Sequence, residues 1–269
     1  MKIWRTRIFL IASLLVLAIS ARAEEIILSA DPWCPYNCTP QSNKEGFQVE
    51  VAREALAFFD IDVTYKTLPY RRAVELAESG GIDGVFGALR GESEKLVYPE
   101  NNIGFSENVA LVKKDKNWSY ATPRDMQNMH ILLIQGYSYG PGIDRFLEVD
   151  RTITTTHLHG QDATNKALRM LSAGRADVFF DDRNVLMNKI QEMKLQDQLK
   201  IAGQVTPPQP TYIAFSPVTE KRLGLSFKFE QGLQRLKTNG RLDEIFEKYG
   251  FRDIPMLRKT GFLMGKPIS

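Results

Sequence analysis

The sequence contains little of what metal centres and nucleotide sites are built from. Only two cysteines and three histidines occur among the 269 residues, and these are the usual ligands of zinc. Neither a His-Glu-x-x-His motif nor a phosphate-binding loop with its lysine is present, which argues against zinc peptidases and nucleotide-hydrolysing enzymes of those types. We therefore expect no metal and no cofactor.

Long hydrophobic runs are also lacking, apart from one near the N-terminus. Three basic residues lie within the first seven positions, an apolar run follows from Ile8 to Ile19, and Ala21 and Ala23 form a small-x-small cleavage site. The run is shorter than the roughly 20 apolar residues that cross a bilayer, so a signal peptide is favoured over a membrane anchor. We predict cleavage after Ala23. Because the first cysteine is Cys34, no lipid anchor is expected, and the mature protein should be a soluble periplasmic monomer.

The chain has no strong excess of charge of either sign. Its formal net charge is +3, but residues 1–23 contain four basic residues and no acidic one, so the mature chain carries a formal charge of −1. Domains that bind nucleic acid usually present a clearly basic surface. Binding to nucleic acid is therefore not expected.

The two cysteines lie close together, in the segment Trp33-Cys34-Pro35-Tyr36-Asn37-Cys38. In the oxidising compartment that the signal peptide implies, a disulfide between Cys34 and Cys38 is expected, and the proline and asparagine between them favour the tight turn that it needs. A metal site that adds the histidines is the alternative. Two thiols without a second close pair of ligands are, however, a weak zinc signature.

Strand and helix patterns alternate along the mature chain. Its first part shows the order β-α-β-α-β in segments 26–30, 47–59, 61–65, 70–79 and 82–86. The second part repeats the theme, with strands predicted at 131–134 and 152–156 and a helix between Asp162 and Gly174. Such alternation is typical of a sheet covered by helices on both faces. We predict an α/β protein of two lobes, each with a mixed, mostly parallel sheet flanked by helices.

Two extended stretches, 106–113 and 210–216, could connect the lobes, because a segment of about domain size lies between them. This arrangement makes the first lobe discontinuous. We predict that it contains residues 24–109 and 210–252, that the second lobe contains residues 110–209, and that residues 253–269 form a loosely packed tail.

Five short segments occur in a characteristic order and spacing. They are Glu45–Val51, Gly80–Asp83, Phe105–Ser106, Gly174–Asp177 and Gly240–Asp243. With the order of elements, they resemble the bacterial extracellular solute-binding proteins of the polar amino-acid type, the second structural class of periplasmic binding proteins, over roughly residues 26–252. The resemblance implies a cleft that closes on a small polar or zwitterionic, amino-acid-like solute and presents the closed form to a membrane ABC permease.

The resemblance also implies a site residue in the second lobe. Family members often hold the ligand's ammonium with an aspartate five positions after the aspartate of the Gly-Arg-x-Asp segment. That position is Asp182 here, with Asp181 as its neighbour. The alternative role of Asp182 is the N-cap of a helix that starts at Arg183.

The first lobe departs from the family pattern. The family's Thr-x-x-Arg segment, whose arginine pairs with the carboxylate of an amino acid, should lie within residues 89–95, but the threonine is missing and the arginine position falls on Glu94 or Lys95. Arg90 is the nearest side chain with the planar fork that suits a carboxylate. We predict Arg90 as this ligand, with Lys95 as the alternative. The departure weighs against an α-amino acid as the solute.

Aromatic and glycine-rich loops supply the other candidates. Trp33 and Tyr36 follow the first strand and Tyr70 precedes the second helix, positions at which large amphipathic rings suit solute contact; packing in the lobe core is the alternative. Tyr137 and Ser138 lie in a glycine-rich loop before a helix, where backbone N–H groups can face an anionic group.

Two other functions compete with solute capture for an importer. One is a periplasmic enzyme on the same scaffold, such as a dehydratase, with Glu107 as a candidate general acid. The other is a ligand-sensing partner of a membrane receptor. We favour binding without catalysis.

Overall fold

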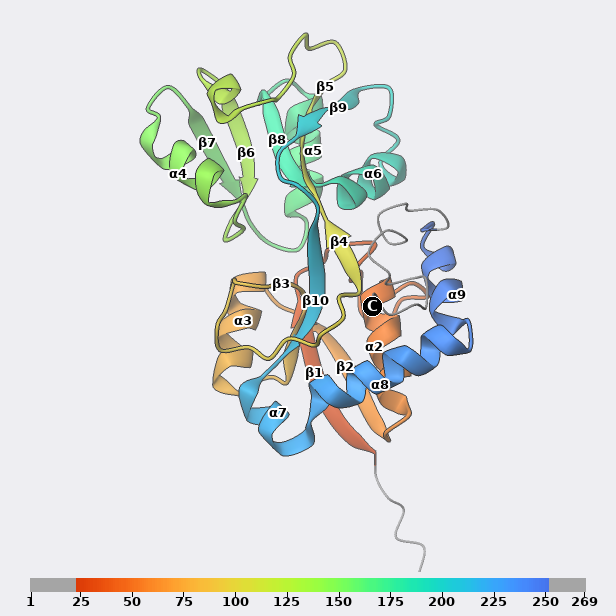
Figure 1. Ribbon diagram of the computed structural model, residues 1–269. Coiled ribbons are helices and arrows are strands. Elements are labelled where there is room, and N and C mark those ends of the chain that lie inside the picture. The colour runs from red at the N-terminus through yellow and green to blue at the C-terminus, as the bar shows by residue number, and fades with distance from the viewer. Residues whose placement is uncertain (1–22, 252–269) are drawn as a thin grey trace, which may run out of the picture.

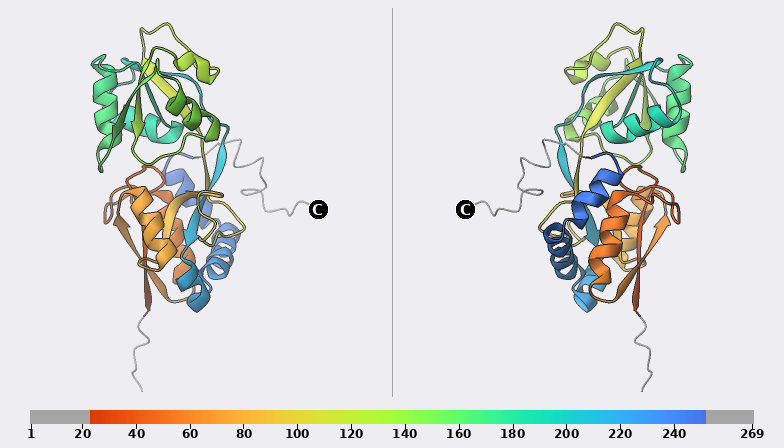
Figure 2. Two further views of the ribbon diagram at one scale, coloured as in Figure 1. Left: turned by 90° about the vertical axis from the view of Figure 1, so that its left-hand side faces the viewer. Right: turned by 90° about the vertical axis from the view of Figure 1, so that its right-hand side faces the viewer.

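The computed structural model describes residues 23–251 as two lobes, each built around a five-stranded sheet (Figure 1). The predicted signal peptide and tail lie almost entirely outside these residues. Side views show the same two lobes stacked one on the other (Figure 2). The predicted α/β, two-lobed fold class is confirmed. Within the described chain, no helix is long and apolar enough to span a bilayer.

The first lobe contains the sheet β2-β1-β3-β10-β4. Its strands are β1 (Glu24–Ala30), β2 (Ile61–Thr67), β3 (Gly84–Leu89), β4 (Gly104–Ser106) and β10 (Gln209–Phe215). β1 is parallel to β2 and β3, whereas β10 is antiparallel to β3 and β4. Its helices are α2 (Phe47–Ala57), α3 (Tyr70–Ser79), α7 (Pro217–Leu223), α8 (Leu225–Thr238) and α9 (Arg241–Lys248).

Helices cover both faces of this sheet because successive residues of its strands point to opposite sides. Phe86 of β3 packs in the core shared with α2, α8 and α9, while its neighbour Val85 packs against α3. α2 and α8 approach each other so closely that a Cβ on Gly232 would lie 2.1 Å from the carbonyl oxygen of Ala55. Only glycine permits this contact.

The second lobe contains the sheet β7-β6-β8-β5-β9. Its strands are β5 (Asn108–Lys113), β6 (His130–Ile134), β7 (Thr154–Leu158), β8 (Val178–Asp182) and β9 (Leu199–Gln204), and its helices are η1 (Pro123–Met126), α4 (Pro141–Val149), α5 (Ala163–Ser172) and α6 (Arg183–Glu192). β6 is parallel to β7 and β8, and β5 is antiparallel to β8 and β9. Phe179 and Phe180 are both fully buried, on opposite faces of β8.

The chain crosses between the lobes twice, from β4 to β5 through Glu107 and from β9 to β10 through residues 205–208. The two crossings are joined to each other, because Val205 N donates to Asn108 O at 2.8 Å and Asn108 N donates to Thr206 Oγ1 at 3.0 Å. Figure 1 shows β10 running along the axis between the lobes. The lobe boundaries at residues 110 and 210 stay a prediction.

Candidate functional site

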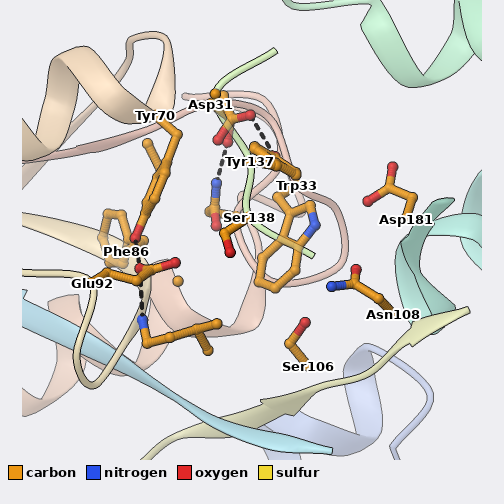
Figure 3. A pocket seen from close by; sticks show the side chains of 15 residues that line it. Asp31, Trp33, Tyr70, Phe86, Glu92, Ser106, Asn108, Tyr137, Ser138 and Asp181 are labelled. Atoms are coloured by element: carbon orange, nitrogen blue, oxygen red, sulfur yellow. Dashed lines mark hydrogen bonds between the residues drawn. The ribbon is translucent and has the colours of Figure 1, made fainter. Parts of the chain in front are cut away.

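A pocket lies between the lobes (Figure 3). The first lobe contributes Ala30, Asp31, Trp33, Asn37, Tyr70, Phe86, Gly87, Leu89, Glu92 and Ser106, and the second lobe contributes Asn108, Gly136, Tyr137, Ser138 and Asp181. Several of these residues lie at or just beyond the carboxyl ends of β1, β3, β6 and β8. Ligands of open α/β sheets bind at these ends, because the loops that follow the strands meet there. The location is therefore that of a ligand site.

Aromatic rings form much of the pocket wall. Trp33 stacks on Tyr36 behind it, with ring centroids 4.1 Å apart and planes inclined by 19°. Across the pocket, Tyr70 and Tyr137 meet edge to face at 6.3 Å. The turn that carries Trp33 is closed by a hydrogen bond from its backbone N to Asn37 O at 2.7 Å. Such a wall buries the apolar part of a small solute and leaves the polar groups to orient it.

The same turn contains the predicted disulfide. Cys34 and Cys38 are joined, with their Cα atoms 4.4 Å apart. Because both thiols are used, neither is available to a metal. Among residues 23–251, which include all three histidines, no group of three potential ligands could hold a metal ion.

Gly87 brings the backbone of β3 against the Trp33 ring. Its φ is +74°, which disfavours any side chain, and an added Cβ would lie 3.4 Å from the ring. The position of this strand is fixed by Gln48 of α2, whose amide oxygen accepts from Gly87 N at 2.9 Å and whose amide nitrogen donates to Thr211 Oγ1 at 3.0 Å. A buried glutamine in the helix thus positions one wall of the pocket.

Of the residues that the structure describes, three with carboxylates line the pocket, and no lysine, arginine or histidine does. Asp31 accepts from the Tyr137 hydroxyl at 2.6 Å, and Glu92 accepts from the Tyr70 hydroxyl at 2.5 Å. Asp181, which is 1% exposed, accepts from Thr164 Oγ1 at 3.1 Å and from Asp182 N at 2.8 Å. Thus only neutral groups donate to these carboxylates.

Burial without a cation changes the acidity of these groups. Desolvation raises the pKa of Asp31 to about 6 and that of Asp181 to about 7, and it also raises the pKa of Glu92. The hydrogen bonds that each carboxylate accepts act in the opposite direction but are the smaller effect. A positive charge placed among them would favour the ionised forms.

Two fully buried polar atoms of the pocket wall have no hydrogen-bond partner among the described residues. They are the indole Nε1 of Trp33, a donor, and Oδ1 of Asn37, an acceptor. Asn37 is fully buried, and its amide nitrogen is used by Asp31 O and the Tyr65 hydroxyl. In Figure 3 the indole nitrogen points toward the side where Asn108 and Asp181 lie. Buried polar groups are normally paired, so these two atoms are available to hydrogen-bond a water molecule or a ligand in the pocket.

The lobes touch each other within the pocket lining and outside it. The Tyr137 hydroxyl of the second lobe donates to Asp31 of the first, and Gln161 Nε2 donates to Thr67 Oγ1 at 3.1 Å. Near the crossings, Asn184 Nδ2 of α6 donates to the Tyr36 hydroxyl at 2.7 Å. Opening the lobes about the crossings would break the first two contacts, so the pocket and the lobe arrangement are coupled.

The structure distributes the predicted site residues unevenly. Trp33, Tyr70, Tyr137 and Ser138 line the pocket, and their role in binding stays a prediction. Tyr36 does not line it. Its ring supports Trp33 from behind, and its hydroxyl donates to Phe105 O at 2.6 Å.

Arg90 lies outside the pocket lining. Its guanidinium donates to Pro99 O at 2.5 Å and lies over the ring of Tyr212, 4.8 Å from the ring centroid. The alternative, Lys95, pairs with Glu78 at 3.1 Å and is also outside the lining. Both predicted partners for a carboxylate are thus engaged elsewhere.

Asp182 is the N-cap of α6, the alternative considered from the sequence. Its carboxylate accepts from Asn184 N at 2.8 Å, Val185 N at 3.1 Å and Glu107 N at 3.0 Å. It is fully buried and does not line the pocket. Glu107, the candidate general acid, forms two bonds of 3.0 Å with the Arg183 guanidinium. Both residues therefore stabilise the region of the crossings.

Sequence reasoning missed six polar residues of the lining. They are Asp31, Asn37, Glu92, Ser106, Asn108 and Asp181, the last of which was considered only as the neighbour of Asp182. One signal could have found two of them. Asp31 follows the last residue of β1, and Asp181 lies at the end of β8. An acid at the carboxyl end of a buried strand is a candidate in any parallel sheet.

Residues 136–140 spell Gly-x-Ser-x-Gly between β6 and α4, a pattern that sequence reasoning also overlooked. It is the pattern of the nucleophile turn of α/β-hydrolases. Here the Ser138 hydroxyl donates to Asp144 Oδ2 at 2.6 Å. None of the three histidines, all within the described chain, lines the pocket. The loop therefore lacks the serine–histidine pair that such catalysis needs.

The two sheets, the two crossings and the pocket at the strand ends define a periplasmic binding protein of the second structural class. The chain belongs to the bacterial extracellular solute-binding proteins, family 3, whose pattern matches residues 26–252. The family predicted from the sequence is confirmed.

Solved structures show the same fold. An ancestral arginine-binding protein with bound arginine has a TM-score of 0.71 and 18% identity, covering 85% of this chain and 99% of its own. A protein described for glutathione import through the cystine ABC importer of Streptococcus mutans has a TM-score of 0.71 and 19% identity, covering 84% and 94%. A histidine kinase sensor domain has a TM-score of 0.66 and 19% identity, covering 85% and 96%. No curated protein matches the sequence.

Proposed function

We propose that this protein captures a small polar solute between its two lobes in the periplasm and delivers it to a membrane ABC importer. The observation that carries the proposal is the pocket at the strand ends, to which both lobes contribute polar groups. A solute held there contacts both lobes at once, so binding favours the closed arrangement that a membrane partner can recognise.

The relatives support transport as the purpose of binding. One solved structure of this fold is described as the substrate-binding protein of an amino acid ABC transporter, and another concerns glutathione import. The histidine kinase sensor domain shows that the fold also serves sensing. We place the protein in the periplasm, because the N-terminal signal pattern leads into an extracellular binding family.

The chemistry of the pocket favours binding over turnover. Its hydroxyl nucleophile candidate, Ser138, is bonded to a carboxylate, and Glu107 is held in an ion pair with Arg183. Asp144, the partner of Ser138, does not line the pocket, and neither does Glu107. Reversible capture needs only the polar groups and the aromatic wall.

A thermal-shift screen of the purified mature protein tests this function. Amino acids, amines, small acids and short peptides would be added at millimolar concentration. A ligand at 100 times its Kd adds about 2.7 kcal/mol to stability, which raises Tm by roughly 5 to 10 °C for a chain of this size. A hit would then be followed by chromatography of the solute, and recovery of a chemical product instead of the unchanged solute would overturn the proposal.

The pocket is localised by a pair of tryptophan variants. Trp33→Ala should weaken the binding of any hit by at least tenfold, because Trp33 forms the pocket wall. Trp118→Ala removes the same side chain from the second lobe, where its indole donates to Asp125 O. This control should bind within about threefold of the parent protein. Equal losses in the two variants would place the site elsewhere.

A further inference from the structure

We propose that the solute is a small organic amine without an adjacent carboxylate, so that the protein selects decarboxylated amines over the corresponding α-amino acids. The inference rests on the proposed function and names its substrate class. It follows from the charges that line the pocket, from the unpartnered atoms in its wall and from the positions of the nearest arginines.

The first observation is the sign of the charge. Asp31, Glu92 and Asp181 approach the pocket from three different segments, after β1, after β3 and at the end of β8. Among residues 23–251, no lysine, arginine or histidine accompanies them in the lining. Asp181 is buried and Asp31 is half-buried, whereas Glu92 is exposed. Carboxylates removed from water are normally paired with cations or bonded to many donors. A bound ammonium or guanidinium group would supply the missing positive charge.

The second observation is independent of the acids. Asn37, fully buried, has an unpartnered acceptor oxygen, and acceptors suit the N–H groups of a cation. The aromatic faces of Trp33 and Tyr70 also favour a cation, because their π systems are negative. The fully buried unpartnered donor, Trp33 Nε1, and the amide of Asn108 can serve a hydroxyl or a carbonyl oxygen but carry no charge. The wall therefore offers more to a positive group than to a negative one.

The third observation concerns the arginines that could hold a carboxylate. Arg90 is bonded to Pro99 O and lies over Tyr212, and Arg183 is paired with Glu107. Arg71, on α3, pairs with Glu75 at 3.5 Å, and its side chain is 80% exposed. It lies at the rim, beside Gly136. A carboxylate in the pocket would thus face three acidic groups without a cation from the lining, and repulsion disfavours it.

Matched pairs of ligands test the inference by titration calorimetry at pH 8. The pairs are agmatine and arginine, cadaverine and lysine, and putrescine and ornithine, whose members differ only by the α-carboxylate. In at least one pair the amine should bind at least thirtyfold more tightly than the amino acid, the size expected for one unpaired desolvated charge.

Each other result has a defined meaning. Equal or tighter binding of the amino acid in every pair that binds would overturn the inference and leave the proposed function intact. Absence of binding by all three amines at millimolar concentration would also overturn it. The wider solute screen then decides separately whether the protein captures a solute at all.

A variant pair connects the selectivity to the pocket. Asp31→Asn keeps the shape and the bond from Tyr137 but removes the charge, so affinity for the bound amine should fall at least tenfold while affinity for its amino acid stays equal or rises. Asp162→Asn makes the same change at an exposed residue paired with Lys166 and should alter neither affinity. Circular dichroism confirms that both variants fold. A parallel loss for the amine and the amino acid would contradict the role assigned to charge.

Discussion

Two adjacent aspartates at the end of β8 belong to two different regions of the molecule. Asp181 lines the pocket and accepts hydrogen bonds from one hydroxyl and one backbone N–H. Asp182 lies at the lobe crossings and accepts from three backbone N–H groups. Its Oδ2 also lies 3.2 Å from the Tyr36 hydroxyl, whose one proton is shared with the closer Phe105 O. Beside it, Glu107 and Arg183 form a bidentate ion pair. Both aspartates are almost fully buried.

The two aspartates differ in how many hydrogen-bond donors the protein itself supplies to each carboxylate. Around Asp182 the protein itself supplies the donors that a buried carboxylate needs, which is the pattern of a structural group. Around Asp181 it supplies fewer, and the pocket beside it is open to another molecule. Because neighbouring residues of a strand point to opposite faces, a shift of one position separates a binding residue from a structural one.

The largest expected effect is on ligand affinity in Asp181→Asn. Loss of this desolvated charge should weaken the binding of a cationic ligand by about thirtyfold or more. Stability should change by less than about 1 kcal/mol, because an asparagine can still accept from Asp182 N. Calorimetry and urea unfolding measure the two quantities. Unchanged affinity would remove Asp181 from the site.

Asp182→Ala tests the structural side of this comparison. In this variant we expect the free energy of unfolding to fall. Three backbone donors lose their acceptor, so the free energy of unfolding should decrease by about 3 kcal/mol. Asp162→Ala is the control, because Asp162 occupies the N-cap of α5 but its side chain forms no capping bond. That variant should lose less than about 1 kcal/mol. Equal losses in urea unfolding would show that the bonds to Asp182 are not what stabilises the crossings.

Binding and stability should depend on pH in opposite directions. The pKa of Asp31 is raised to about 6 and that of Asp181 to about 7, so a cationic ligand should bind at least tenfold more weakly at pH 5 than at pH 8. The native state of the free protein holds these protons more tightly than the unfolded chain. The contribution of Asp31 and Asp181 to stability is thus complete below about pH 4, the pKa of an aspartate in the unfolded chain. This contribution is lost as the pH rises through 6 to 7.

The other groups that face these carboxylates do not reverse this sign. The pKa of Tyr70 and that of Tyr137 are raised by burial, so both hydroxyls stay neutral, and Glu92 shifts in the same direction as the aspartates. Burial also raises the pKa of Asp182, next to Asp181, to about 6, so Asp182 adds to the same dependence of stability on pH. Calorimetry at pH 5, 6, 7 and 8 measures the affinities, and Asp181→Asn should flatten the profile. A profile unaffected by that variant would assign the titration to another group.

The smallest effects are expected for Arg90→Ala and Lys95→Ala. Neither residue lines the pocket, so both variants should bind a ligand within about threefold of the parent. Arg90→Ala should lose up to about 1 kcal/mol of stability, because Arg90 packs on Tyr212. A large loss of affinity in either variant would restore the carboxylate clamp predicted from the sequence.

Element type was predicted better than element position. The strand expected at 82–86 is β3, from Gly84 to Leu89. Asp83 precedes it, and its carboxylate accepts from Ile27 N at 2.7 Å and from Thr219 Oγ1 at 2.6 Å. These partners are 56 and 136 residues away. The local pattern of apolar residues carries no information on hydrogen bonds between residues so far apart. The prediction from that pattern therefore misplaced the start of the strand.

The sequence by itself determined the signal pattern, the α/β alternation, the disulfide candidate and the family, because each is written in neighbouring residues or in a fixed order of short segments. It also found the aromatic loop residues Trp33, Tyr70 and Tyr137. Tertiary structure alone decided which charges face the pocket. The Arg90 guanidinium donates to Pro99 O and lies over the Tyr212 ring, outside the pocket. Asp31 accepts a hydrogen bond from Tyr137, which is 106 residues away in the sequence. The orientation of a polar side chain depends on the partners that folding brings to it, and those partners are not its neighbours in the sequence.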